Sequence, residues 1–236
     1  MSDTTTPDAA PIGILMLDSR FPRIPGDAGN PLSWPFPVAI RVVRGASPQR
    51  IVREGGGDSL ATFIDAARAL VEEGAVGITT TCGFLSLFQQ ALAEAVPVPV
   101  VTSSLAQVEM VNRMLPAGRV AGIQTIAASS LTARHLAAAN VPAGTPIGTT
   151  EGGREFTRSI LNDEPTLDVA LARQDNVEAA LALKEANPHL GAIVLECTNM
   201  VPYAPDISVA TGLPVYSIHT LVRWMHMGLC PPRFAV

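Results

Sequence analysis

The sequence predicts an α/β fold made of two pseudo-symmetric lobes, each with a mostly parallel sheet flanked by helices. Short apolar runs of strand length alternate with segments of helical spacing along the 236 residues. A spacing is also repeated: Cys82 precedes Pro99 by seventeen residues, and Cys197 precedes Pro214 by seventeen. In both copies a strand precedes the cysteine, and a helical segment and a Pro-Val step follow it. We therefore expect two related lobes with an active site in the cleft between them.

The strands and helices of the first half are predicted from apolar runs and their turn signals. Strands are expected at residues 12–17, 38–43, 76–81 and 98–102. Residues 59–73 show helical spacing and stop before Gly74, a typical end of a helix, and a second helix follows Cys82. Residues 21–37 contain five prolines and two glycines, which predicts a long irregular loop of the kind that is usually functional.

The second half repeats this order. Strands are expected at residues 119–125, 192–196 and 215–218, and helices at 129–140, 167–186 and 203–211. We assign residues 11–103 together with 219–230 to lobe 1, which carries Cys82. Residues 104–218 form lobe 2, which carries Cys197, and residues 1–10 are expected to be a flexible tail.

Composition excludes several classes of function. The formal charge is −5 and the isoelectric point is near 5.3, which gives no electrostatic footprint for a nucleic-acid partner. Fifteen of the sixteen basic residues are arginines, so Lys184 alone is left for imine chemistry, and it lies in a polar helical segment. There is no C-x-x-C motif and no pair of histidines one helical turn apart. We therefore expect neither a metal nor an organic cofactor.

The expected location is the cytoplasm, with no membrane partner. The first ten residues lack the basic start and apolar run of a signal peptide, and no apolar stretch reaches the roughly 18 residues of a membrane span. Three cysteines, an odd number, favour free thiols over a disulfide framework.

Cys82 and Cys197 each lie just after a strand and just before a helical segment. Free backbone N–H groups and the helix dipole are expected to lower the thiol pKa below its usual value of roughly 8.5. A thiolate on one face of a carbon and a thiol on the other invert that carbon without a cofactor. A single buried cysteine is more often a small hydrophobic residue, but the matched pair favours chemistry. Cys230 has no such context and is assigned no role.

Polar groups near the two cysteines are candidates for binding a substrate carboxylate. Thr81 and Thr198 flank the cysteines, and the N–H groups of Gly83 and Asn199 follow them. Two arginines, Arg20 and Arg23, lie in the loop expected to overhang the cleft. Each is either a bidentate carboxylate ligand or a solvated surface residue.

Two motifs carry a family resemblance. Thr80-Thr81-Cys82-Gly83 and Glu196-Cys197-Thr198-Asn199-Met200 resemble the cysteine motifs of the aspartate/glutamate racemase superfamily, and residues 12–19 resemble its first strand. The resemblance extends from about residue 11 to residue 230. It implies a homodimer of two-lobed subunits that racemises a small, acidic amino acid without a cofactor. It also implies that Cys82 and Cys197 are the acid/base pair, that Asp18 assists them, and that Thr81 and Thr198 bind the substrate carboxylate.

The motifs also depart from those of glutamate racemases. Gly83-Phe84 replaces Asn-Thr after the first cysteine, and Asn199 replaces a histidine after the second. The superfamily further includes hydantoin racemases, arylmalonate decarboxylases, maleate isomerases and an algal-type dimethylsulfoniopropionate lyase. A cysteine-dependent lyase on a related carboxylate and a non-catalytic carboxylate-binding protein are therefore the alternatives.

Two further features have more than one interpretation. Trp34-Pro35-Phe36 in the proline-rich loop is a lid, a hydrophobic plug or a dimer contact. Glu196 is either a buried carboxylate that tunes the neighbouring thiol or a residue that is paired elsewhere.

Overall fold

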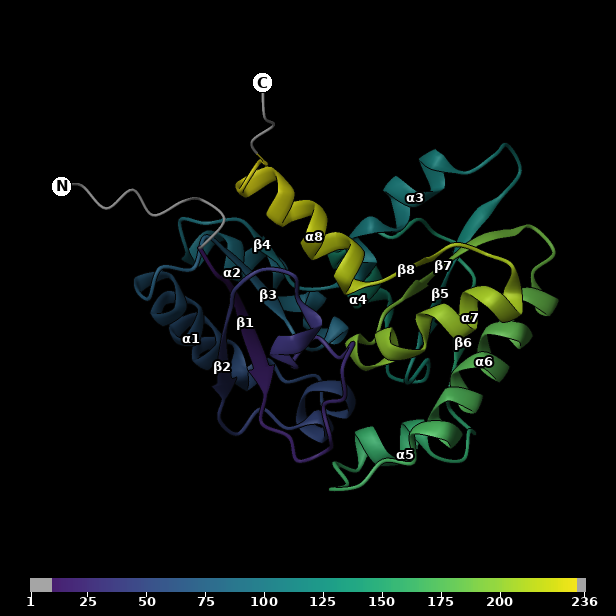
Figure 1. The fold of residues 1–236 in the computed structure, drawn as a ribbon, viewed down its shortest axis with the longest axis horizontal. Helices are drawn as coiled ribbons and strands as arrows, with labels where there is room; N and C mark the ends of the chain where they lie inside the picture. Colours follow the sequence, from purple (N-terminus) through teal and green to yellow (C-terminus); the bar gives the residue numbers. More distant parts are fainter. Residues whose placement is uncertain (1–9, 233–236) are drawn as a thin grey trace.

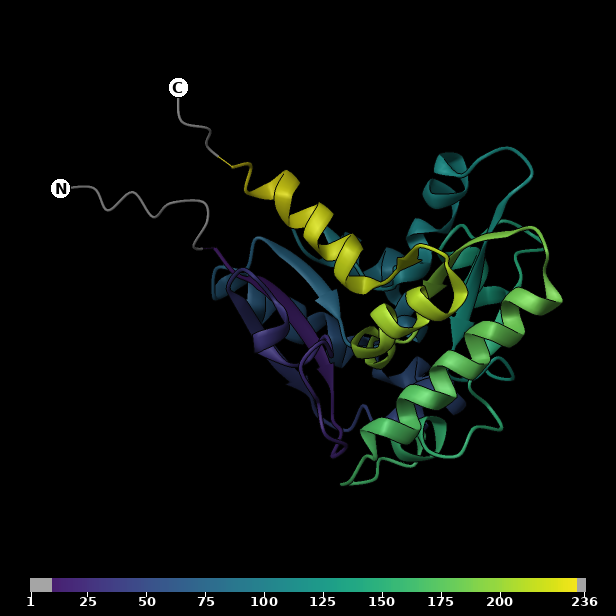
Figure 2. The ribbon, with the colours of Figure 1, turned by 45° about the vertical axis from the view of Figure 1, so that its right-hand side comes forward.

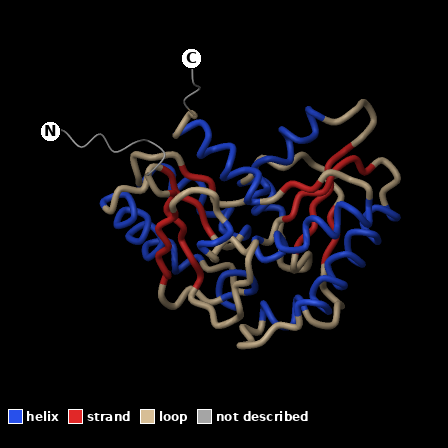
Figure 3. The backbone as a smooth tube through the Cα atoms, viewed as in Figure 1, coloured by secondary structure: helices blue, strands red, loops and turns tan. Residues whose placement is uncertain are grey.

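The computed structural model describes residues 10–232 and contains two four-stranded sheets, one in each lobe (Figure 1). The first sheet has the order β2-β1-β3-β4, and the second has the equivalent order β6-β5-β7-β8. Every strand pairing is parallel. The strands are β1 (Ile12–Leu17), β2 (Val38–Val43), β3 (Gly77–Thr80), β4 (Val100–Val101), β5 (Val120–Thr125), β6 (Ile147–Thr149), β7 (Leu190–Leu195) and β8 (Val215–Tyr216). The predicted fold class is confirmed, and Figure 3 shows the two groups of strands on either side of the molecule.

The repeated seventeen-residue spacing has a direct structural cause. In the first lobe the N–H of Ile78 donates to the carbonyl of Pro99 (2.9 Å), and in the second the N–H of Ile193 donates to the carbonyl of Pro214 (3.0 Å). Each donor lies four residues before its cysteine. The spacing therefore aligns the strand that carries the cysteine with the next strand of its sheet.

Short 3₁₀ helices follow both cysteines, before an α-helix begins. These are η5 (Gly83–Phe88), which leads into α2 (Gln89–Ala95), and η7 (Thr198–Tyr203), which leads into α7 (Ala204–Thr211). The sequence predicted the helical character of both segments but not their tight first turns.

The remaining helices cover the sheets and close the molecule. They are α1 (Leu60–Glu72), α3 (Val108–Met114), α4 (Ala133–Ala138), α5 (Phe156–Leu161), α6 (Val169–Ala186) and α8 (Ile218–Leu229), together with the short η2 (Pro31–Ser33), η3 (Gln49–Arg53), η4 (Gly57–Ser59) and η6 (Ser104–Gln107). The long helix α6 contacts α7 and β6 on the outside of the second sheet (Figure 2). Helix α4 of the second half contacts η5 of the first, and α8 contacts both β3 and β8.

The proline-rich loop of residues 21–37 packs on the C-terminal helix. The ring of Trp34 stacks on His219 with 4.2 Å between centroids, and Phe36 stacks on His226 at 3.9 Å. The indole N–H of Trp34 donates to the carbonyl of Ala28 (3.0 Å). Within this chain the Trp34–Phe36 segment therefore forms a hydrophobic plug between the loop and α8.

The sequence did not predict α3 or β6. These elements have seven and three residues, too few to establish a hydrophobic period. Among residues 10–232, no helix is long and apolar enough to span a bilayer. The predicted N-terminal tail falls almost entirely on residues 1–9, outside the described residues.

Candidate active site

A mostly apolar cavity lies where the carboxyl ends of β1, β3, β5 and β7 meet. It is narrow: the volume open to the centres of water molecules is about 20 Å³. Its apolar lining comes from β1, η3, η5, α5 and the loops beside them, and its polar lining comes from the two cysteine motifs. The lining residues are Leu17, Phe21, Pro48, Val52, Thr81, Cys82, Gly83, Phe84, Ile126, Ile160, Leu161, Glu196, Cys197 and Asn199. No lysine, arginine or histidine is among them.

The structure brings Cys82 and Cys197 together in this cavity. Each is the residue at which a 3₁₀ helix begins, each has extended backbone geometry, and each is 7% exposed. The backbone N–H groups of Phe84 and Leu85 lower the pKa of Cys82, and that of Asn199 lowers the pKa of Cys197. The matched positions therefore give both thiols the backbone donors that the sequence predicted.

Burial nevertheless changes the pKa values of both thiols more than these donors do. Together with the nearby Glu196 carboxylate, it raises the pKa of Cys82 to about 12. Burial and Glu196 also raise the pKa of Cys197 well above its usual value, and a charge on Cys82 adds to the effect. The expected lowering of the thiol pKa values is therefore wrong, and both cysteines are neutral thiols near pH 7.

Glu196 is a buried carboxyl group that begins the second cysteine motif and lies against Gly83 of the first. Its side chain is fully buried, and its Oε2 accepts a hydrogen bond from the hydroxyl of Thr125 (2.7 Å). Its Oε1 has no hydrogen-bond partner among the described residues. Burial raises the pKa of Glu196 to about 7, against the opposing hydrogen bonds from Thr125 and the N–H of Ile126. The structure thus favours the interpretation that Glu196 tunes the thiols.

Asn199 is held in one orientation by the proline-rich loop. Its Nδ2 donates to Asp27, so its Oδ1 faces Cys197 and accepts a hydrogen bond from the Sγ–H (3.4 Å). Asp27 is 2% exposed and also accepts from Arg23 (2.9 Å) and from the N–H of Gly29 (2.7 Å). Arg23 therefore forms an ion pair within the loop and does not line the cavity. Its charge nevertheless lowers the pKa of Cys82.

The other predicted site residues have structural partners. The hydroxyl of Thr198 donates across the lobes to the carbonyl of Thr81 (2.7 Å), and the hydroxyl of Thr81 accepts from the N–H of Leu17 (3.1 Å). Asp18 pairs with Arg44 (3.2 Å) outside the lining of the cavity.

Arg20 also lies outside the cavity. Its side chain is 71% exposed, and it pairs with Asp163 of the second lobe. Of the predicted substrate-binding residues, Thr81, Gly83 and Asn199 line the cavity, whereas Thr198, Arg20 and Arg23 do not. The roles of all these residues stay predictions.

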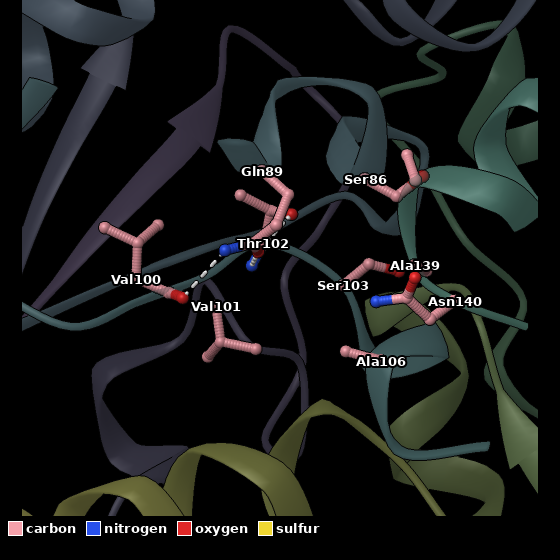
Figure 4. A pocket seen from close by; sticks show the side chains of 10 residues that line it. Ser86, Gln89, Val100, Val101, Thr102, Ser103, Ala106, Ala139 and Asn140 are labelled. Atoms are coloured by element: carbon pink, nitrogen blue, oxygen red, sulfur yellow. Dashed lines mark hydrogen bonds between the residues drawn. The ribbon is translucent and has the colours of Figure 1, made fainter. Parts of the chain in front are cut away.

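A second cavity lies between η5, the end of β4 and the end of α4 (Figure 4). It is lined by Ser86, Gln89, Val100, Val101, Thr102, Ser103, Ala106, Ala138, Ala139 and Asn140. The amide of Gln89 is already bonded to Val100 and Thr102 (2.9–3.0 Å). Since this cavity holds no titratable side chain, it is the weaker candidate for a reaction site.

The sequence missed Asp27 and the apolar walls of the first cavity. Asp27 lies in an irregular loop, 172 residues before its partner Asn199. Phe21, Pro48 and Ile160 come from three separate segments that carry no motif. Only the position of Glu196, next to Cys197, was a usable sequence signal. Among the described residues, no group of three or more histidine, cysteine, aspartate or glutamate side chains is arranged to hold a metal ion.

Solved structures share this architecture. Allantoin racemase from Klebsiella pneumoniae has a TM-score of 0.65 and 17% identity over 96% of this chain and 96% of its own. Unliganded arylmalonate decarboxylase has a TM-score of 0.57 and 19% identity over 95% and 94% of the two chains. Glutamate racemase from Bacillus anthracis has a TM-score of 0.55 and 15% identity over 94% and 84%. The protein therefore has the racemase/decarboxylase fold, as the resemblance to the aspartate/glutamate racemase superfamily implied.

Curated sequences narrow the relationship. Dimethylsulfoniopropionate lyase of Durusdinium sp. clade D is 30% identical over 236 residues, which cover 96% of this chain and 78% of that protein. Dimethylsulfoniopropionate lyase 6 of Emiliania huxleyi (strain CCMP1516) is 30% identical over 247 residues, which cover 97% of this chain and 62% of that protein. No protein-family model matches the sequence. The chain belongs to the dimethylsulfoniopropionate lyase family.

Proposed function

We propose that the protein is a cysteine-dependent lyase that eliminates the β-substituent of a small onium carboxylate of the dimethylsulfoniopropionate type. The observation that carries this proposal is the composition of the cavity. It contains two thiols and one carboxyl group within apolar walls, and it has no basic side chain. The sequence relatives of the chain that are named dimethylsulfoniopropionate lyase agree with this chemistry.

The cavity fits this substrate better than it fits aspartate or glutamate. An acidic amino acid carries two carboxylates and needs cationic or multiple polar partners for the second one. Arg20 and Arg23 were the candidates for this role, but both are engaged in ion pairs outside the cavity. A dimethylsulfonium group instead presents two methyl groups, which suit apolar walls.

The elimination needs one base and no external reactant. A thiolate takes the proton from the carbon next to the carboxylate, and the electron pair of that C–H bond becomes the new C=C bond. The C–S bond at the β-carbon breaks, and its electron pair leaves with the sulfur as neutral dimethyl sulfide. The products are acrylate, dimethyl sulfide and a protonated thiol. Since dimethyl sulfide is a neutral leaving group, it needs no acid.

Racemisation is the second candidate function. It is supported by the placement of both cysteines in one cavity at equivalent positions of the two lobes. A racemase needs both thiols because the proton is returned on the opposite face, whereas a lyase needs only one base. The two functions share the first step, removal of the proton next to the carboxylate.

The products distinguish the two functions. The protein is incubated with dimethylsulfoniopropionate while dimethyl sulfide is measured by gas chromatography and acrylate by NMR. In parallel, L-aspartate, L-glutamate and L-alanine are incubated in deuterium oxide. Release of dimethyl sulfide and acrylate in equal amounts supports the lyase. Exchange of the α-proton and interconversion of enantiomers, without elimination, would establish the racemase in its place.

A further inference from the structure

The carboxylate of Glu196 is a buried charge for which the protein supplies no cation. The residue is fully buried and lines the cavity, and its Oε1 has no hydrogen-bond partner among residues 10–232. The nearest polar support is neutral, from the hydroxyl of Thr125. A buried carboxylate without a counter-ion is costly, and Glu196 responds by holding its proton up to about pH 7. A ligand that brings a positive charge would favour the ionised form.

Comparison of equivalent positions in the two lobes shows that only the second lobe carries a carboxyl group here. Glu196 follows β7 directly, and the equivalent residue after β3 is Thr81. Their backbones are bonded alike: the N–H of Thr81 donates to Leu15 (3.0 Å), and that of Glu196 donates to Gln124 (2.8 Å). The hydroxyl of Thr81 is used within its own lobe. The fold therefore accepts a neutral side chain at this position, and the charge at Glu196 is not required by the architecture.

Gly83 makes room for the carboxylate at the seam between the lobes. A Cβ atom built on Gly83 would overlap both Oε1 and the carbonyl oxygen of Glu196, and it would lie 2.9 Å from Cδ. The first motif thus presents a bare backbone to the carboxylate of the second. This close approach places Oε1 beside the first cysteine motif, at the wall of the cavity.

We propose that Glu196 is the binding site for the cationic end of the substrate and that it selects methylated onium groups, whether sulfonium or quaternary ammonium. This inference rests on the proposed lyase function and assigns its specificity-determining residue. A primary ammonium has three N–H donors to satisfy, whereas a methylated onium group has none and tolerates apolar walls. The unpartnered carboxylate oxygen is buried at the cavity wall, which also contains the ring of Phe84, and an aromatic ring suits a cation. The ring of Phe21 already holds a cation, the guanidinium of Arg23, 4.7 Å from its centroid.

The same contact would couple binding to catalysis. The charge of Glu196 raises the pKa values of both thiols. A cation bound against the carboxylate offsets that charge, so the thiolate becomes easier to form when the substrate is in place. The substrate's own charge thereby activates the base.

Two ligands that differ only in charge test this assignment. Both carry the same carboxylate, and the other end is a cation in 3-(trimethylammonio)propanoate and its neutral isostere, a tert-butyl group, in 4,4-dimethylpentanoate. Their dissociation constants are measured by calorimetry at about pH 8, above the pKa of Glu196, for the wild type and for Glu196→Gln. We expect the wild type to prefer the cation by about tenfold or more, since a buried charge contact is worth this much or more. In Glu196→Gln the two constants should become nearly equal.

Thr125→Ser is the matched control, because it changes the residue beside Glu196 but keeps the hydroxyl that stabilises its charge. It should retain the preference for the cation, and thermal melting confirms that both variants are folded. A wild type without the preference, or one that binds neither ligand at millimolar concentration, overturns the inference. So does a Glu196→Gln variant that keeps the preference. Glu196-dependent binding without cleavage of dimethylsulfoniopropionate would refute the lyase alone, and cleavage without the preference would refute this inference alone.

Discussion

Replacing Asp27 by asparagine tests how the proline-rich loop holds the active site. Three donors converge on this buried carboxylate: the guanidinium of Arg23, the N–H of Gly29 and the amide of Asn199. An asparagine of the same shape has one acceptor oxygen and one NH₂ group. At least one donor must then face another donor, and Arg23 loses its counter-ion.

The size of the effect follows from burial. The side chains of Asp27 and Arg23 are only 3% and 11% exposed, so the pair is screened little by water. Removing one partner of such a pair costs about 3–5 kcal/mol, and the hydrogen bonds that asparagine retains reduce this to about 2–4 kcal/mol. The released amide of Asn199 no longer holds its Oδ1 toward Cys197, so turnover should fall as well.

Urea unfolding monitored by circular dichroism measures the change in the free energy of unfolding. Asp18→Asn is the matched control, because the Asp18–Arg44 pair is 35% and 82% exposed and should contribute no more than about 1 kcal/mol. If Asp27→Asn is within about 1 kcal/mol of the wild type and equally active, the loop does not hold Asn199 as described. A folded but inactive Asp18→Asn would instead support the catalytic role that the family resemblance implied for Asp18.

Three further predictions use the same measurements. Gly83→Ala forces a side chain into the space of Glu196 and should destabilise the protein by about 1–3 kcal/mol or more. Its control is Gly228→Ala, in a helix with open space around the glycine, which should be neutral or stabilising. Equal effects of the two substitutions would contradict the close approach of Gly83 to Glu196. The pKa of Glu196 is raised from 4.5 to about 7 on folding, so the folded state binds the extra proton. The free energy of unfolding should therefore fall by about 3 kcal/mol as the pH rises from about 4.5 to 7. Glu196→Gln should lack that decline, and parallel pH profiles would refute the shift. Thr198→Val leaves the buried carbonyl of Thr81 without its donor from the other lobe, and the free energy of unfolding should fall by about 1–3 kcal/mol. An unchanged unfolding midpoint would show that this hydrogen bond does not join the lobes.

The sequence was sufficient for the architecture because the architecture depends on local patterns. Apolar runs defined the strands, and the Cys-to-Pro spacing revealed the repeat because the Pro99 and Pro214 carbonyls bind equivalent strand residues. Since both cysteines follow central strands, the rule that ligands bind at the carboxyl ends of parallel strands placed them in one cavity.

The chemistry of the site depends on burial and on distant contacts, which a local pattern does not contain. Backbone donors after Cys82 were predictable, but the apolar enclosure that raises its pKa comes from several remote segments. Arg23 was recognised as a cation near the cleft, but its partner Asp27 was not, so its commitment to an ion pair was missed. Glu196 was noticed, and only the structure shows that one of its oxygens lacks a partner.

The central claim is that thiols of the cavity, and not merely the fold, carry out the reaction. Its most direct test is the rate of dimethyl sulfide release by three single variants, Cys82→Ser, Cys197→Ser and Cys230→Ser. All three cysteines are buried and free of disulfides, but only Cys82 and Cys197 line the cavity. We predict that the cavity variant that removes the base loses about 100-fold or more in kcat, while Cys230→Ser stays near the wild type. Wild-type rates in both cavity variants would contradict the account.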